Sequence, residues 1–204
     1  MVEAAHSSVD DIRYVRTLAE GGAHAPLLGG RFMIWWGALL TAAYVTHHLA
    51  LTGRIGNGPE VFGLLWAAFA IAGVVGHCVL IRAMSPKAGG GSAGNRASRF
   101  VWLAASFAIG SMVAGTTALA MQGAGPAAFD WIVPVAFAVY ACALLSTGGL
   151  ARDPVSLAAG AGAVAMVGLF TALILTQDRY LIAAAGVLLT VLVPGLILFR
   201  AEPR

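Results

Sequence analysis

The sequence predicts an all-α, polytopic membrane protein with six transmembrane helices, arranged as three tandem hairpins and preceded by a cytoplasmic amphipathic helix. Of the 204 residues, 59% are apolar and only 10% are charged, and the mean hydropathy is +0.85. Soluble domains carry about a quarter charged residues, so a soluble domain, a disordered chain and a secreted disulfide scaffold fit the composition poorly. The charged residues also lie outside six long apolar stretches. We therefore expect most of the chain to be inserted in a membrane.

Residues 1–30 form a polar N-terminal tail. Ser8 and Asp11 have the spacing of a helix capping box, and Gly21-Gly22 is typical of a helix end. The apolar residues at positions 12, 15, 18 and 19 fall on one face of the helix between them. A helix of about 12 residues is marginal in water. We expect it to lie at the cytoplasmic membrane surface, where it either fixes the start of the first span or docks a partner.

Six apolar stretches of about 20 residues are each long enough to cross a bilayer as a helix. They cover residues 32–52, 61–81, 100–121, 131–150, 155–176 and 180–199. None of them contains Asp, Glu, Lys or Arg. Because a charge in the middle of a bilayer is costly, this segregation supports the six boundaries.

The basic residues predict the orientation of the chain. With the N-terminus inside, ten of the twelve Lys and Arg residues lie on the cytoplasmic side and only Arg54 and Arg179 lie opposite, which places both termini in the cytoplasm. Anionic lipid headgroups are the expected partner of this basic face, and no nucleic acid is required. The expected membrane-surface anchors are Arg13, Arg16, Arg31, Arg82, Arg99, Arg152 and Arg200.

The Ala-, Gly- and Arg-rich composition is typical of a bacterium with high genomic GC content, so we expect a multi-pass protein of a bacterial inner membrane. The first 30 residues lack the apolar core of a secretory signal. The first span is therefore expected to act as its own insertion signal.

The chain repeats itself at the level of hairpins. Residues 31–86 and 99–154 both open with Arg-Phe, have a Gly-Pro turn between their spans, and end in Arg followed by Pro. These ranges form the first two hairpins, and residues 87–98, rich in Gly, Ser and Ala, form a flexible cytoplasmic linker between them. Residues 155–204 form a looser third hairpin with a short cytoplasmic C-terminus.

A few polar side chains inside the spans are the candidates for a polar path or a sensor: His47, His48, His77, Thr116 and Thr117. At 1.5 Å per residue, His47 and His77 differ in depth by roughly 15 Å, so the two imidazoles cannot hold one haem within a protomer. The two cysteines are interpreted as packing residues of the spans. We therefore expect no cofactor and no metal.

The function that this pattern favours is a non-enzymatic inner-membrane protein that acts by helix packing, as an accessory, scaffold or stress-response component. Small residues at helical spacing, such as Ala68, Ala72 and Gly76, favour close helix contacts in a homo-oligomer or a larger membrane complex. One alternative is a small passive permease or channel for an ion or small solute. A second alternative is a haem- or metal-binding membrane protein that uses the histidines.

Overall fold

The computed structural model describes residue 13 and residues 26–83 and 89–202. Arg16 and the expected amphipathic helix, apart from Arg13, lie outside the described residues. The described ranges contain helices and no strand. The long helices are α2 Gly30–Leu51, α3 Pro59–Arg82, α4 Ala93–Leu119, α5 Ile132–Ala151, α6 Pro154–Ala172, α7 Arg179–Val187 and α8 Val193–Ala201. Three short elements join them: η1 Ala120–Ala124, η2 Pro126–Trp131 and η3 Leu188–Leu192.

Five helical segments in the described residues are long and apolar enough to cross a membrane, which indicates a multi-pass membrane protein. They are Pro59–Arg82, Ala93–Ala124, Pro126–Ala151, Pro154–Ala172 and Arg179–Ala201, and they coincide with the second to sixth expected spans. α2 occupies the first expected span. It carries two tryptophans and two histidines and is not among these five segments.

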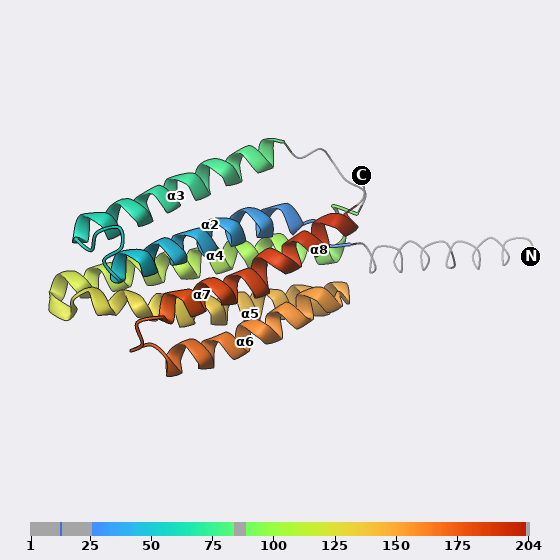
Figure 1. The fold of residues 1–204 in the computed structure, drawn as a ribbon. Helices are drawn as coiled ribbons and strands as arrows, with labels where there is room; N and C mark the ends of the chain where they lie inside the picture. The colour runs from blue at the N-terminus through green and yellow to red at the C-terminus, as the bar shows by residue number, and fades with distance from the viewer. Residues whose placement is uncertain (1–12, 14–25, 84–88, 203–204) are drawn as a thin grey trace, which may run out of the picture.

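Successive long helical segments run in alternating directions, with α7, η3 and α8 continuing as one segment, so the chain turns at two ends of one bundle (Figure 1). Helices α2, α4 and α6 begin at one end, which also carries Arg31, Arg82, Arg99, Arg152 and Arg200. We call it the arginine-rich end. The α2–α3 loop, the η1–η2 segment and the α6–α7 turn lie at the other end, which we call the Asp130 end.

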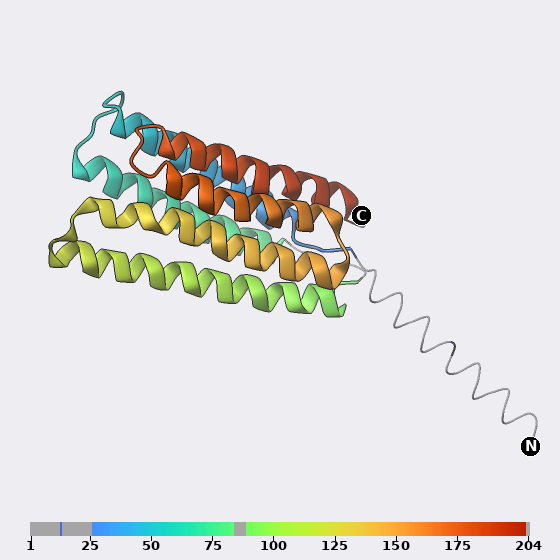
Figure 2. The same cartoon turned by 90° about the horizontal axis from the view of Figure 1, so that it is seen from below.

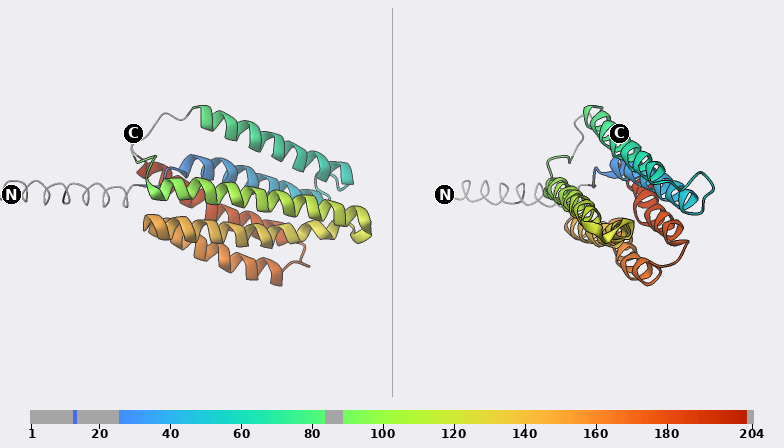
Figure 3. Two further views of the ribbon diagram at one scale, coloured as in Figure 1. Left: turned by 180° about the vertical axis from the view of Figure 1, so that it is seen from behind. Right: turned by 90° about the vertical axis from the view of Figure 1, so that its left-hand side faces the viewer.

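The core lies where α2 packs against α7 and α8, and where α5 packs against α6. Phe137, Leu144, Phe170 and Val187 are almost completely buried there. α4 lies beside α5 (Figure 2). α3 lies at the periphery beside α2, as the end-on view shows (Figure 3).

Two glycines bring α2 close to η3 and α8. A Cβ atom on Gly195 would lie 2.7 Å from Met33 Cβ, and one on Gly37 would lie 2.8 Å from Leu192 N. Small residues permit such close helix contacts in membranes. The π-helical segment η3 precedes Pro194, which has no N–H to give to the carbonyl of Thr190 one turn earlier. The irregular turn thus has a local cause in the sequence.

The beginning of α4 differs from the expected boundary. The helix begins at Ala93, inside the range 87–98 assigned to a flexible linker. The side chain of Ser92 accepts a hydrogen bond from the backbone N–H of Asn95, which is the arrangement of a helix N-cap. Residues 93–98 are therefore part of a helix.

Candidate functional site

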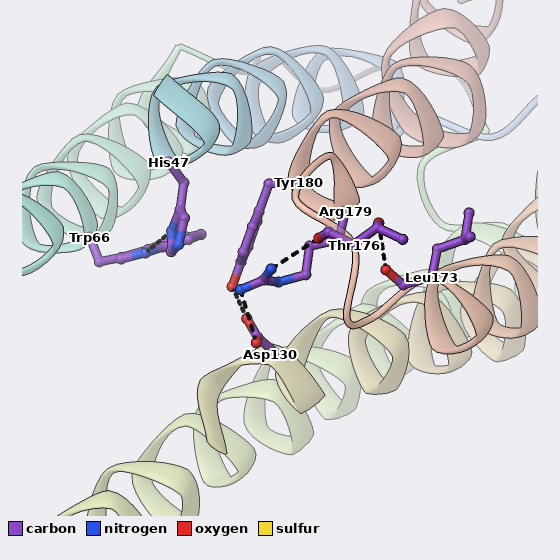
Figure 4. Close-up of polar contacts among 7 residues, drawn as sticks. All are labelled: His47, Trp66, Asp130, Leu173, Thr176, Arg179 and Tyr180. Atoms are coloured by element: carbon purple, nitrogen blue, oxygen red, sulfur yellow. Dashed lines mark hydrogen bonds and ion pairs between the residues drawn. The ribbon is translucent and has the colours of Figure 1, made fainter. Parts of the chain in front are cut away.

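The polar side chains of the bundle gather most densely at the Asp130 end, where they join four elements of the fold. We call this group the Asp130 cluster: His47 from α2, Trp66 from α3, Asp130 from η2, and Arg179 and Tyr180 from α7 (Figure 4). Trp66 Nε1 donates to His47 Nδ1 over 3.1 Å. The imidazole of His47 stacks on the ring of Tyr180, with centroids 3.8 Å apart.

Asp130 connects this aromatic group to an ion pair. The hydroxyl of Tyr180 donates to Asp130 Oδ1 over 2.6 Å, and Arg179 Nη2 lies 3.3 Å from Asp130 Oδ2. The carboxylate and the guanidinium side chains are only 15% and 19% exposed, so water screens the pair weakly. The guanidinium also lies over the Tyr180 ring. Figure 4 shows Arg179 reaching back to the carbonyl of Thr176, which holds the start of α7 in place.

His48 lies next to this cluster but has a different environment. The residue is 7% exposed, and its Nδ1 atom has no hydrogen-bond partner among the described residues. His48 Nε2 lies 3.9 Å from an oxygen of Asp178, whose side chain is 72% exposed. The contact is an ion pair only when the imidazole is protonated.

His77 lies on α3 towards the arginine-rich end. Trp36 Nε1 donates to His77 Nδ1 over 3.3 Å, and the ring of Phe32 lies 4.8 Å from the imidazole. The structure therefore places His47 and His77 in two separate aromatic groups, as the difference in depth predicts. In both groups Nδ1 accepts a hydrogen bond, which fixes the neutral ring with its proton on Nε2.

The hydrogen bonds from the two tryptophans to His47 and His77 affect how these imidazoles could ligate a metal or a haem. A histidine ligates through an unprotonated nitrogen, usually while its other ring nitrogen donates a hydrogen bond. In His47 and His77 one nitrogen accepts from an indole N–H, so the other carries the proton. The described residues also contain no group of three or more His, Cys, Asp or Glu side chains that could hold a metal ion. Cys78 and Cys142 are free thiols.

The two tryptophan–histidine pairs come from a repeat that the sequence analysis missed. Both α2 and α3 carry Phe, three residues, Trp, ten residues and His; the residues are Phe32, Trp36 and His47 in α2, and Phe62, Trp66 and His77 in α3. Because the two helices run in opposite directions, each Trp meets the His of the other copy. Each His also contacts the Phe of the other copy, with centroids 4.8 Å apart in both cases. A comparison of the two spans with each other would have found this spacing.

The hydroxyl candidates do not come together. Thr116 is buried and donates to the carbonyls of Met112 and Val113, and Thr117 donates to the carbonyl of Val113 while facing outwards. Thr147 and Thr190 likewise donate to carbonyls one turn earlier in their own helices. Each of these hydroxyls therefore donates its hydrogen bond within its own helix.

The arginine-rich end is held by two buried polar residues that the sequence analysis did not single out. Asn95 is 6% exposed; its side chain accepts from the N–H of Leu28 and donates to the carbonyls of Pro26 and Gly89. Glu202 accepts from the N–H of Gly30 and lies 3.8 Å from Arg31. The segment before α2, the beginning of α4 and the end of α8 are thereby connected.

The expected anchors have different surroundings. Arg31 pairs with Glu202 and lies over the ring of Phe199. Arg99 donates to the carbonyl of Gly90. Arg13, Arg82, Arg152 and Arg200 are exposed.

Both ends of the bundle are held together by buried or partly buried polar contacts between segments that are far apart in the sequence. Each polar side chain of the Asp130 cluster is used by another member of the same cluster. Comparison with known proteins adds no further constraint: the sequence matches no family model, and neither a curated protein nor a solved structure matches the chain.

Proposed function

We propose that the protein is a non-enzymatic membrane protein that acts by helix packing, as an accessory or scaffold component of a homo-oligomer or a larger membrane assembly. It has six spans in three hairpins, with both termini on the cytoplasmic side of a bacterial inner membrane. Its membrane-surface anchors are the arginines of the arginine-rich end.

The observation that carries this proposal is the uneven burial of the helices. In the most apolar window of α3 only 6% of the residues are buried, and in α4 11%, against 44% for Pro126–Ala151 and 50% for Arg179–Ala201. Among the described elements, α3 packs closely only on α2, and α4 only on α5 and on η1 and η2. Two complete helices therefore present long free sides to the membrane.

The free side of α4 has the composition of a helix contact. Ala104, Ala108, Ser111 and Gly115 are exposed at helical spacing, and small residues line helix–helix contacts in membranes because they let two backbones approach closely. The polar groups inside the bundle, in contrast, are engaged with each other or with their own helices. This supports assembly over a passive permease, because Thr116 and Thr117 donate to their own helix.

The test is the mass of the native particle, measured by native mass spectrometry from membrane-derived nanodiscs. We expect a species larger than the 20.8 kDa protomer, and we expect Ala108→Trp to reduce it because the larger ring prevents close approach of a second helix. Leu103→Trp is the matched control, since Leu103 is an exposed large residue on the same helix. A lone wild-type protomer in the native membrane, or equal effects of the two substitutions, would contradict the proposal.

A further inference from the structure

A cavity opens at the arginine-rich end, between the segment before α2, the α5–α6 turn and the end of α8. Its volume is about 180 Å³, more than ten times the roughly 10–15 Å³ that one water needs. It is lined by Pro26, Leu27, Ala151, Arg152, Asp153, Pro154, Leu198 and Ala201. The cavity is therefore large enough for a group of several atoms.

The lining combines one cation and one anion with apolar walls. Arg152 and Asp153 are neighbours on the α5–α6 turn, and the other lining residues are apolar. The guanidinium of Arg152 has no hydrogen-bond or ion-pair partner among the described residues. One oxygen of Asp153 accepts from the N–H of Ser156 over 2.7 Å, so its second oxygen is available.

The backbone holds Arg152 in a position where glycine is usual. Arg152 ends α5 with φ 54° and ψ 36°, and it is the only non-glycine residue with a positive φ in the described part of the chain. The residue after a helix commonly adopts this left-handed conformation, and Gly fits there most easily. An arginine at this position is an unusual choice that brings its side chain to the cavity.

The position of the cavity along the bundle matches the level of lipid headgroups. The same end carries Arg31, Arg82, Arg99 and Arg200 at or near the ends of their helices, and Lys and Arg side chains concentrate at the membrane–water boundary. A molecule bound at this depth is therefore expected to have a polar headgroup and an apolar chain that extends into the membrane.

We propose that this cavity binds the phosphoethanolamine headgroup of a zwitterionic phospholipid, with Arg152 on the phosphate and Asp153 on the ammonium. Leu27 and Leu198 lie beside the glycerol and the first methylenes of the acyl chains. An anionic lipid without an ammonium group leaves Asp153 unpaired and facing the phosphate. A choline headgroup has no N–H to donate. The site goes beyond the proposed assembly role and does not depend on it.

The experiment measures lipid binding to the full chain in mild detergent by native mass spectrometry. Phosphatidylethanolamine, phosphatidylglycerol and phosphatidylcholine with the same acyl chains are compared, together with soluble phosphoethanolamine. We expect phosphatidylethanolamine to bind about tenfold tighter than the other two lipids, since each lacks one charge-assisted contact. We expect soluble phosphoethanolamine to bind at least about tenfold more weakly, because it buries no methylenes.

The substitutions at Arg152 and Asp153 are chosen to remove a charge from the cavity while keeping the backbone conformation and the helix cap. Arg152→Asn retains a side chain that tolerates the left-handed backbone, and Asp153→Asn retains an oxygen for the N-cap of α6. Both should lose the preference for phosphatidylethanolamine, whereas Arg152→Lys should retain most of it. Arg54→Asn is the control, because Arg54 is an exposed arginine that does not line the cavity and is not one of the expected membrane-surface anchors.

Unchanged melting temperatures without added lipid would show that the variants fold. Equal binding of the three lipids, or an effect of Arg54→Asn equal to that of Arg152→Asn, would overturn the site. Tighter binding of phosphatidylglycerol would overturn the role of Asp153. Binding of soluble phosphoethanolamine as tight as that of the lipid would overturn a membrane lipid as the ligand.

Discussion

The imidazole of His47 lies almost parallel to the ring of Tyr180, with 18° between the planes and 3.8 Å between the centroids. The two residues come from α2 and α7, which are far apart in the sequence and packed together in the bundle. Through Tyr180 this stack is joined to Asp130, and through His47 to Trp66. The Asp130 cluster thus links α2, α3, η2 and α7 in one connected set of contacts.

Asp130→Asn should destabilise the folded protein by about 2–3 kcal/mol, because it removes the charge that partners a mostly buried Arg179. Tyr180→Phe should cost about 1–2 kcal/mol, because it leaves one carboxylate oxygen without its donor. The measurement is reversible unfolding in mixed micelles. A double-mutant cycle of the two changes should show strong coupling.

Asp178→Asn is the matched control for this pair, because the Asp178 side chain is 72% exposed. We expect it to change the free energy of unfolding by less than about 0.5 kcal/mol. If it costs as much as Asp130→Asn, the Asp130 cluster does not hold the bundle together.

Trp36→Phe and Trp66→Phe should each cost about 1–2 kcal/mol, since each leaves an imidazole nitrogen without its N–H donor. The two pairs lie towards opposite ends of the bundle, so the double variant should cost the sum of the single ones. Unfolding of the three variants checks this. A double variant no worse than either single one would show that the pairs do not act separately.

The tautomer of the two imidazoles is a separate prediction. With Nδ1 accepting from an indole, both His47 and His77 should carry their proton on Nε2. Nitrogen-15 NMR of histidine-labelled protein in micelles distinguishes the two ring nitrogens. Replacing Trp36 should change the His77 signals and leave those of His47 unchanged. Protonated Nδ1 atoms in the wild-type protein would rule out the hydrogen bonds described here.

Gly37→Ala should destabilise the contact of α2 with η3 by about 1–3 kcal/mol, because the added methyl would meet the backbone of Leu192. Gly110→Ala is the control in another helix, since nothing lies within 4 Å of a Cβ atom there. We expect it to be neutral or slightly stabilising. Thermal unfolding in the same detergent compares them, and equal losses would show that close approach at Gly37 is unimportant.

The lengths of the apolar stretches and the positions of the turn residues predicted most of the helices. Apolar stretches of bilayer length predicted the five segments that are long and apolar enough to cross a membrane, and the turn residues placed most of their ends to within a few residues. The linker boundary was less accurate, because the helix beginning at Ala93 depends on the cap at Ser92 and on the contacts of Asn95 with Pro26 and Leu28. Such contacts join residues far apart in the chain and leave no periodic pattern.

The candidate site was predicted only in part, for the same reason. The histidines were visible as polar residues inside apolar stretches. Asp130 and Tyr180, in contrast, were assigned to a loop and to the edge of a span, where a charge or a phenol is ordinary. Their importance comes from the fold, which brings the beginning of α7 next to η2 and so allows the 2.6 Å hydrogen bond from Tyr180 to Asp130.

The paired tryptophans and histidines of α2 and α3 also determine how these helices can move. A slide of α3 along α2 would shift both tryptophans away from their histidines at the same time, so both hydrogen bonds would be lost together. The two helices therefore have one relative position along their axes in which both Trp–His hydrogen bonds form. A motion of α3 that keeps both hydrogen bonds must move α2 as well. A force on the free side of α3 is therefore transmitted through Trp66 and His47 to Tyr180 and the core.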